Sequence, residues 1–244
     1  MVINVRGIKK IFNGADGEPD FHLEIPEMNF ELGEVIYVMG HNGSGKSVFL
    51  KLMAGEMLPS NGYVLLKVDG KTWNANKYRS GIVRQKAEES LATDLTVKEN
   101  LLIRLATTSL VDLFFPSIRL HSKVKSLINS HSELSNKLDQ PCRNLSGGQR
   151  QTLAFLAVAS QDSKLLFLDE FLAATDQSTS TLLRRLAKEY AMRVRACVFI
   201  VSHDVNMATQ DADRIIILKQ GRLVHDLRNG DSEWNEKSVR NLLL

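Results

Sequence analysis

The sequence is poor in cysteine, with two residues among 244. Cys142 and Cys197 are far apart and have no paired spacing, so we expect neither a disulfide framework nor a zinc site. This scarcity excludes the small secreted domains that depend on such cross-links. It fits a protein of the reducing cytosol.

Long apolar runs are also missing. No stretch approaches the roughly 18 consecutive apolar residues that a membrane-spanning helix needs. The first four residues, Met-Val-Ile-Asn, do not resemble a secretion signal. If the protein works at a membrane, we expect another chain to hold it there.

The sequence has no large excess of charge of either sign, with 31 Lys and Arg against 28 Asp and Glu and a net charge of +3. Such a balance gives no reason to expect nucleic acid or an acidic membrane surface as a partner. A hydrophobic fraction of 43% is ample for a globular core, and 244 residues fit one large domain or two small ones. Composition therefore indicates an ordinary globular protein and names no function.

The most informative feature that is present is the segment 40–47, Gly-His-Asn-Gly-Ser-Gly-Lys-Ser, which lies between the apolar runs 35–39 and 48–53. Its spacing, G-x-x-x-x-G-K-S, predicts a phosphate-binding loop between a buried strand and a helix, where backbone N–H groups form an anion nest. We expect Lys46 to reach the β- and γ-phosphates and the Ser47 hydroxyl to take one position on Mg²⁺. The candidate binding residues are Gly40, Asn42, Gly43, Ser44, Gly45, Lys46 and Ser47.

A second candidate phosphate site is the segment 145–149, Leu-Ser-Gly-Gly-Gln, at the start of a predicted helix. A serine hydroxyl, free N–H groups and the helix dipole suit an anion, although the segment has no lysine. One protomer can hardly bring both loops to the same nucleotide. We therefore expect two chains arranged head to tail, with Ser146 and Gly148 of one facing the γ-phosphate bound by the other.

The periodicity of apolar residues divides the chain into segments with a strand pattern and a long segment with a helical pattern. Alternation over 2–6 and 21–25 predicts antiparallel strands, whereas a helical period dominates from 86 to 160 and begins with a capping box at Thr96 and Glu99. Residues 117–138 continue this helical block, with Ile118, Val124, Leu127 and Ile128 on one side. The apolar segment Leu-Phe-Phe-Pro at 113–116 is either a docking surface or core.

The roles of two further residues, Phe12 and Gln85, cannot be decided from the local sequence alone. Phe12, before a turn cluster, is either a flat surface for stacking a purine or an ordinary core residue. Gln85 ends a predicted strand at 81–85, where its amide oxygen could approach Mg²⁺ and an attacking water.

Taken together, the phosphate loop, the glutamine after a strand and the Leu-Ser-Gly-Gly-Gln segment resemble the nucleotide-binding subunit of an ATP-binding cassette (ABC) transporter, over essentially the whole chain. The resemblance implies an α/β fold, with a P-loop NTPase core, a mixed sheet, an N-terminal antiparallel β-subdomain and an inserted helical subdomain. It implies one ABC ATPase domain over 1–244, in which 1–85 and 161–244 form the core and 86–160 form the helical subdomain with the signature motif, Leu-Ser-Gly-Gly-Gln at 145–149.

The resemblance also implies roles for residues that follow the signature motif. Residues 165–170 match the Walker B strand, in which Asp169 would hold Mg²⁺ through a bound water and Glu170 would act as general base. Asp176 matches the D-loop aspartate of the dimer interface, and His203 matches the switch histidine that contacts the γ-phosphate.

The resemblance settles the open residues as well, making Phe12 the adenine-stacking aromatic and Gln85 the Q-loop glutamine. The implied catalytic set is then Glu170, His203 and Gln85, and the implied metal set is Ser47, Gln85 and Asp169. The phosphate-loop residues and Phe12 are joined in nucleotide binding by Ser146, Gly147, Gly148, Gln149 and Asp176. Residues 171–175, Phe-Leu-Ala-Ala-Thr, depart from the family's usual Pro-Thr and Leu, which concerns the dimer interface and not the chemistry.

The implied function is ATP hydrolysis that powers transport through a separate membrane permease, with ATP and Mg²⁺ as cofactors. The implied partners are a second ABC ATPase subunit, identical or different, the permease, and in an importer a solute-binding protein, but no nucleic acid. The chain would then lie on the cytoplasmic face of the inner (plasma) membrane, attached through the permease. The stretches 95–101 and 145–153 look closest to importer cassettes for small organic solutes such as amino acids. The alternative is a soluble ABC ATPase without a transport role, such as the iron–sulfur assembly type.

Overall fold

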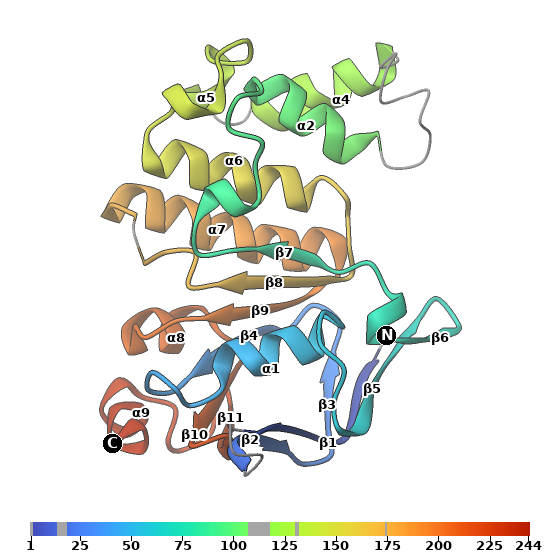
Figure 1. The fold of residues 1–244 in the computed structure, drawn as a ribbon. Helices are drawn as coiled ribbons and strands as arrows, with labels where there is room; N and C mark the ends of the chain where they lie inside the picture. Colours follow the sequence, from blue (N-terminus) through green and yellow to red (C-terminus); the bar gives the residue numbers. More distant parts are fainter. Residues whose placement is uncertain (1, 14–18, 107–117, 130–131, 174) are drawn as a thin grey trace. The chain divides into compact units, whose positions relative to one another are not determined.

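The chain forms two compact units in the computed structural model, which describes residues 2–13, 19–106, 118–129, 132–173 and 175–244 (Figure 1). The first unit comprises Met1–Ile82, Ser163–Glu170 and Ala187–Leu244. The second comprises Val83–Asp162 and Phe171–Leu186.

The first unit is built on a mixed sheet. Within the described residues this sheet has 11 strands, in the order β6-β5-β1-β2-β11-β10-β4-β9-β8-β7, with β3 paired to β1. The N-terminal strands pair antiparallel, as the alternating pattern predicts, whereas β10, β4, β9 and β8 are parallel neighbours. The strands are β1 (Val2–Asn13), β2 (Pro19–Ile25), β3 (Met28–Glu31), β4 (Val35–Met39), β5 (Asn61–Val68), β6 (Lys71–Asn74), β7 (Gly81–Val83), β8 (Leu165–Asp169), β9 (Cys197–Val201), β10 (Arg214–Lys219) and β11 (Arg222–Arg228).

The core of this unit surrounds its central parallel strands. All five residues of β4 and of β9 are buried, as expected for strands covered on both faces. The Phe199 ring of β9 packs with its centroid 4.9 Å from that of Phe30, 5.2 Å from Phe167 and 6.1 Å from Phe49. This packing joins β9 to β3, β8 and α1 (Lys46–Met53), and the carboxyl ends of β4 and β8, the two strands that pair with β9, carry the candidate site. The helices of the unit are α1 (Lys46–Met53), α8 (Val205–Asp211), α9 (Glu236–Leu243) and the second half of α7 (Gln177–Val194).

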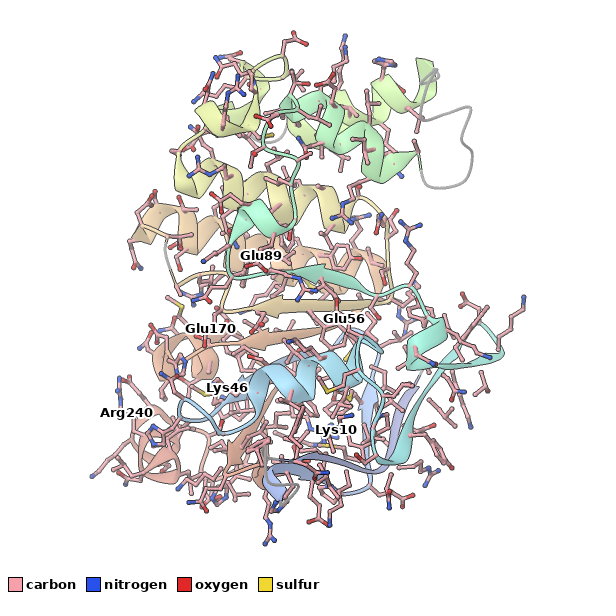
Figure 2. The ribbon with its side chains drawn as sticks, in the orientation of Figure 1. Lys10, Lys46, Glu56, Glu89, Glu170 and Arg240 are labelled. Atoms are coloured by element: carbon pink, nitrogen blue, oxygen red, sulfur yellow. The ribbon has the colours of Figure 1, made fainter. Side chains whose placement is uncertain are left out.

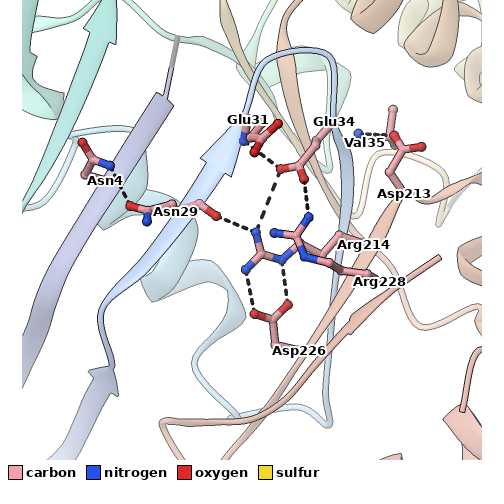
Figure 3. Close-up of polar contacts among 9 residues, drawn as sticks. All are labelled: Asn4, Asn29, Glu31, Glu34, Val35, Asp213, Arg214, Asp226 and Arg228. Carbon is pink, nitrogen blue, oxygen red and sulfur yellow. Dashed lines mark hydrogen bonds and ion pairs between the residues drawn. The ribbon is translucent and has the colours of Figure 1, made fainter. Parts of the chain in front are cut away.

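The buried guanidinium of Arg214 ties β10 and β11 to β3 (Figure 3). Arg214, only 3% exposed, donates from Nε and from a terminal nitrogen to the two carboxylate oxygens of Asp226, each over 2.6 Å. Its other terminal nitrogen donates to the carbonyl oxygen of Asn29 over 2.6 Å, and the guanidinium lies 4.6 Å from the Phe30 ring centroid. A buried guanidinium is tolerated only when its donors are satisfied in this way.

The second unit is helical, as the sequence predicts for 86–160. The capping box at the start of its first helix is confirmed: Glu99 N donates to Thr96 Oγ1 over 3.1 Å, and Thr96 N donates to Glu99 Oε2 over 2.8 Å. Val124 and Ile128 are buried on the predicted apolar side, whereas residues 113–116 and the side chain of Ile118 lie outside the described residues. The helices are α2 (Val97–Leu105), α4 (Ile118–Asn129), α5 (Ser132–Ser135), α6 (Gly147–Ala159) and the first half of α7. In the part of the chain that the structure describes, no helix is long and apolar enough to cross a membrane.

Candidate active site

The predicted phosphate loop connects β4 to α1, at the carboxyl end of a central strand. Gly40 has a φ of 147°, and a Cβ there would lie 2.3 Å from the carbonyl oxygen of Leu218. Gly45 has a φ of 100°, and a Cβ there would lie 2.6 Å from Leu23 Cδ1. Only glycine fits these two positions, since each combines a left-handed backbone with a close neighbour. The loop is therefore folded as the spacing predicts.

Lys46 begins α1 and turns its ammonium group into the loop. Its Nζ donates to the carbonyl oxygens of Gly40 over 2.8 Å and of His41 over 3.0 Å, and the residue is 6% exposed. Burial lowers the pKa of Lys46, while the negative charges of Glu170 and Asp169 act in the opposite direction. The two carboxylates are therefore close enough to the ammonium to influence its charge.

A cavity of about 410 Å³ lies against the loop. That volume falls in the range of ligand sites, which is about 300–1,000 Å³. Figure 2 shows Lys46 and Glu170 on the same side of the first unit. The carboxyl ends of the parallel strands β4, β9 and β8 meet at one edge, which explains this placement. The cavity is lined by Phe21, Asn42, Gly43, Gly45, Lys46, Ser47, Val48 and Glu170.

Glu170 and His203 are joined by a direct contact. Glu170 follows β8, His203 follows β9, and His203 Nε2 lies 3.0 Å from Glu170 Oε1. Glu170 has a φ of 45°, a left-handed conformation that costs a non-glycine residue about 1–3 kcal/mol. Such strain is found at active sites, where it holds a reactive group in a fixed position. A carboxylate with an imidazole partner is able to accept a proton from water.

Oxygen donors suited to Mg²⁺ are present at the same edge. The hydroxyl of Ser47 lines the cavity, and Asp169 is the last residue of β8. Among the described residues, no cluster of three or more His, Cys, Asp or Glu could hold a metal by itself. Mg²⁺ in phosphate-transfer sites needs only one or two protein oxygens beside phosphate and water. The residues present therefore fit this ion.

The predicted stacking aromatic, Phe12, lies in β1, which pairs with β2. Its register partner in β2 is Phe21, with ring centroids 6.1 Å apart, and Phe21 is the aromatic that lines the cavity. Lys10 Nζ lies 5.7 Å from the centroid of the Phe12 ring. The stacking role of Phe12 stays a prediction. Phe21 was missed, although the alternation over 21–25 already marked it as a strand residue.

The phosphate loop also contacts the last helix, which the sequence does not reveal. A ring nitrogen of His41 lies 2.8 Å from the carbonyl oxygen of Leu243 in α9. A further cavity of about 430 Å³ is lined there by residues that include Ser44, Gln220 and Leu244. His41 is thus held from outside the loop.

The signature motif, residues 145–149, leads into α6 in the second unit. Ser146 is the N-cap: its Oγ accepts from Gln149 N over 3.2 Å, while Ser146 N donates to Gln149 Oε1 over 3.2 Å. A Cβ at Gly148 would lie 2.6 Å from Thr179 Oγ1, so α7 requires a glycine there. A Cβ at Gly147 would meet no atom within 4 Å. The backbone at Gly147 is therefore open to approach.

The two remaining predicted residues also belong to the second unit. Gln85 is exposed, and the strand predicted over 81–85 was too long, because β7 ends at Val83. Asp176 accepts bonds from Ser178 Oγ over 2.6 Å, Thr179 N over 2.8 Å and Thr179 Oγ1 over 3.0 Å. These bonds lower its pKa to about 2, so its carboxylate is charged at neutral pH. The structure thus groups the phosphate loop, Asp169, Glu170 and His203 in one unit, and Gln85, Ser146–Gln149 and Asp176 in the other.

Comparisons with known proteins agree with this fold. A family model described as ABC transporter matches residues 23–173. The tyrosine transport ATP-binding protein of Clostridioides difficile (strain R20291) is 30% identical over 236 residues, which cover 95% of this chain and 94% of that protein. The hemin import ATP-binding protein HmuV of Vibrio vulnificus (strain YJ016) is 31% identical over 208 residues, covering 82% of this chain and 76% of that protein.

A solved structure of cbiO1 from Clostridium perfringens, described as part of the ABC transporter complex cbiONQ, has the same fold. It superimposes with a TM-score of 0.79 at 23% identity, covering 98% of this chain and 93% of that one. The chain therefore belongs to the ABC transporter family, whose ATP-binding subunits hydrolyse ATP. The predicted fold class, a P-loop NTPase with a mixed sheet, an antiparallel N-terminal part and a helical insertion, is confirmed.

Proposed function

We propose that this chain powers the import of a small organic solute, such as an amino acid, through a separate membrane permease. The observation that carries the ATP-hydrolysing part of the proposal is the cavity lined by the phosphate loop, Lys46 and Glu170, with His203 in contact with Glu170. Such an arrangement binds a nucleoside triphosphate at one end and positions a general base at the other.

The chemical step is hydrolysis of the γ-phosphate bond of ATP. Lys46 and the N–H groups of residues 40–45 bind the phosphates and stabilise the charge that develops on them. Glu170 orients the attacking water and accepts its proton, while His203 holds the carboxylate in position and contacts the γ-phosphate. Phe12 or Phe21 packs against the adenine.

Mg²⁺, when bound, neutralises charge on the phosphate oxygens. Ser47 and Asp169 would hold it through oxygen donors, together with Gln85. The role of these residues is to place the ion beside the phosphate loop, which leaves Glu170 to act on the water.

Coupling to transport requires two ATPase subunits, either two copies of this chain or this chain with a relative. Ser146–Gln149 and Asp176 of one subunit would complete the nucleotide site of the other, so that ATP binding closes the pair and hydrolysis opens it. We propose that residues 86–160 act as the helical subdomain within one domain over 1–244. The permease would dock beside Gln85 and this subdomain, on the cytoplasmic face of the membrane.

The import direction and the solute are supported by the relatives alone. One relative with 94% coverage is named for tyrosine transport, and another is named for hemin import. A solute-binding protein outside the membrane would then be a further partner. The alternative, a soluble ABC ATPase of the iron–sulfur assembly type, would keep the same site and would lack the permease.

The partners of the tagged chain decide between these functions. The chain is expressed at its natural level, membranes are extracted in mild detergent, and proteins that copurify are identified by mass spectrometry. A stoichiometric polytopic membrane protein supports the transporter. Only soluble partners, with the chain absent from membranes, would contradict it.

A further inference from the structure

The start of α6 has a lysine partner that lies outside the signature segment. Lys137 is half-buried between α5 and α6, and its Nζ donates to Gln149 Oε1 over 2.8 Å. The same oxygen accepts a bond from Ser146 N over 3.2 Å, and Gln149 N donates to Ser146 Oγ over 3.2 Å. Lys137, Ser146 and Gln149 therefore form one hydrogen-bonded group.

This group fixes which atoms the Gln149 side chain presents. An ammonium group has only donors, so the carboxamide must turn its oxygen toward Lys137. The amide nitrogen then points away from Lys137. The amide nitrogen carries two N–H donors. The Ser146 hydroxyl, which accepts from Gln149 N, keeps its own hydrogen to donate elsewhere.

The resulting surface suits an anion with several terminal oxygens. It offers the hydroxyl of Ser146, the amide of Gln149 and the first N–H groups of α6, at a backbone that is open at Gly147. Lys137 adds the positive charge that the segment 145–149 lacks. A terminal phosphoryl group of a nucleotide has the matching chemistry.

We propose that Lys137 is a positioning residue of the signature site. It holds the Gln149 carboxamide with its donors toward the nucleotide of the facing subunit, and it raises the positive potential there. This inference rests on the proposed two-subunit ATP site. It extends that site to a residue twelve positions from Gln149 in the sequence.

The test measures ATP-driven dimerisation by light scattering, with Mg²⁺ present, in a Glu170→Gln background that prevents turnover. Lys137→Met is expected to raise the half-saturating ATP concentration about tenfold, as for loss of a charge-assisted hydrogen bond. Lys137→Arg keeps the positive charge, and its half-saturating ATP concentration is expected to lie close to that of the protein with Lys137. Lys125→Met, at an exposed lysine of α4, is the matched control and should leave the half-saturating ATP concentration unchanged.

Gln149→Glu tests whether the N–H donors of this side chain are needed for dimerisation. A glutamate at this position keeps the capping box and pairs more strongly with Lys137, but it has no N–H donors. The proposal predicts that this variant melts no earlier than its parent and loses ATP-driven dimerisation. Dimerisation that is retained would show that no N–H donor of residue 149 is needed at the nucleotide.

The outcomes distinguish the inference from the proposed function. If the parent protein, which carries Glu170→Gln alone, dimerises with ATP and the Lys137→Met variant does so at the same ATP concentration, the inference is overturned and the proposed function stands. If the parent forms no ATP-dependent dimer, the two-subunit mechanism fails and the inference fails with it. Should Lys137→Met melt early, the Gln149→Glu variant decides, and dimerisation by that variant overturns the inference.

Discussion

His203 Nε2 lies 3.0 Å from Glu170 Oε1, and the two residues follow neighbouring parallel strands. The register that places Asp169 opposite Val201 brings both side chains to the same edge of the sheet. Glu170 is therefore held by its strained backbone on one side and by an imidazole on the other. This contact supports the proposal that Glu170, and not Asp169, acts on the attacking water.

Glu170→Gln is expected to reduce phosphate release by a factor of about 10²–10⁴, the usual contribution of a positioned general base. An amide keeps the shape of the side chain and its contact with His203 but accepts no proton. ATP should still bind, and the ATP-bound dimer should accumulate in light scattering. Near-normal hydrolysis by this variant would show that another group takes the proton.

Gly148→Ala is expected to destabilise the second unit through a clash with α7. The added methyl would lie 2.6 Å from Thr179 Oγ1, which Asp176 Oδ2 holds at 3.0 Å and keeps from moving away. A loss of about 1–3 kcal/mol in the free energy of unfolding is typical of such overpacking.

The double variant Gly148→Ala, Thr179→Ala checks this cause, because it removes the atoms that clash. Urea unfolding should show that the second substitution restores part of the stability lost through the first. Strictly additive losses would mean that Thr179 is not the obstacle.

Asp176 is expected to stabilise the start of α7 in a pH-dependent way. Hydrogen bonds from Ser178 and Thr179 lower its pKa from 3.8 to about 2, so the folded state favours the charged form. The contribution is complete above about pH 4 and is lost as the pH falls toward about 2.

Asp176→Asn keeps a good N-cap but cannot titrate in this range. The free energy of unfolding of both proteins is measured from pH 6 to pH 2. The difference between them should be constant above about pH 4, and below it the wild type should lose stability relative to Asp176→Asn. A difference that stays constant over the whole range would refute the assigned cause.

Arg214→Met is expected to cost about 2–3 kcal/mol of stability. The substitution leaves Asp226 and the carbonyl oxygen of Asn29 without their charged partner, in a region where Arg214 is 3% exposed. Arg240→Met is the control, because Arg240 pairs with Glu236 on the surface and its side chain is 60% exposed. Chemical denaturation should show a change below about 0.5 kcal/mol for the control. Equal losses of stability in both variants would contradict the structural role of the buried Arg214.

The sequence predicts the local features of this protein well. The spacing of residues 40–47 places glycines where the loop needs a positive φ, and the capping box at Thr96 is a contact between residues three positions apart. The roles of Glu170 and His203 came from resemblance, and only the strand register explains why they meet.

Features that depend on long-range packing were not predictable. Phe21 reaches the cavity because β2 pairs with β1 in a particular register, and Gly148 is required because of the position of Thr179 on another helix. Lys137 reaches Gln149 across a turn whose path no short-range pattern encodes. The segment 145–149 has no lysine of its own, and the folded chain brings Lys137 to it.

The most direct test of the account is phosphate release by the membrane complex captured through this chain, compared between wild type and Lys46→Met. The account predicts that both capture the same membrane partner and that only the wild-type complex releases phosphate from ATP, since Lys46 supplies the charge inside the phosphate loop. Equal rates would place ATP hydrolysis in another component and would contradict the assignment of this site.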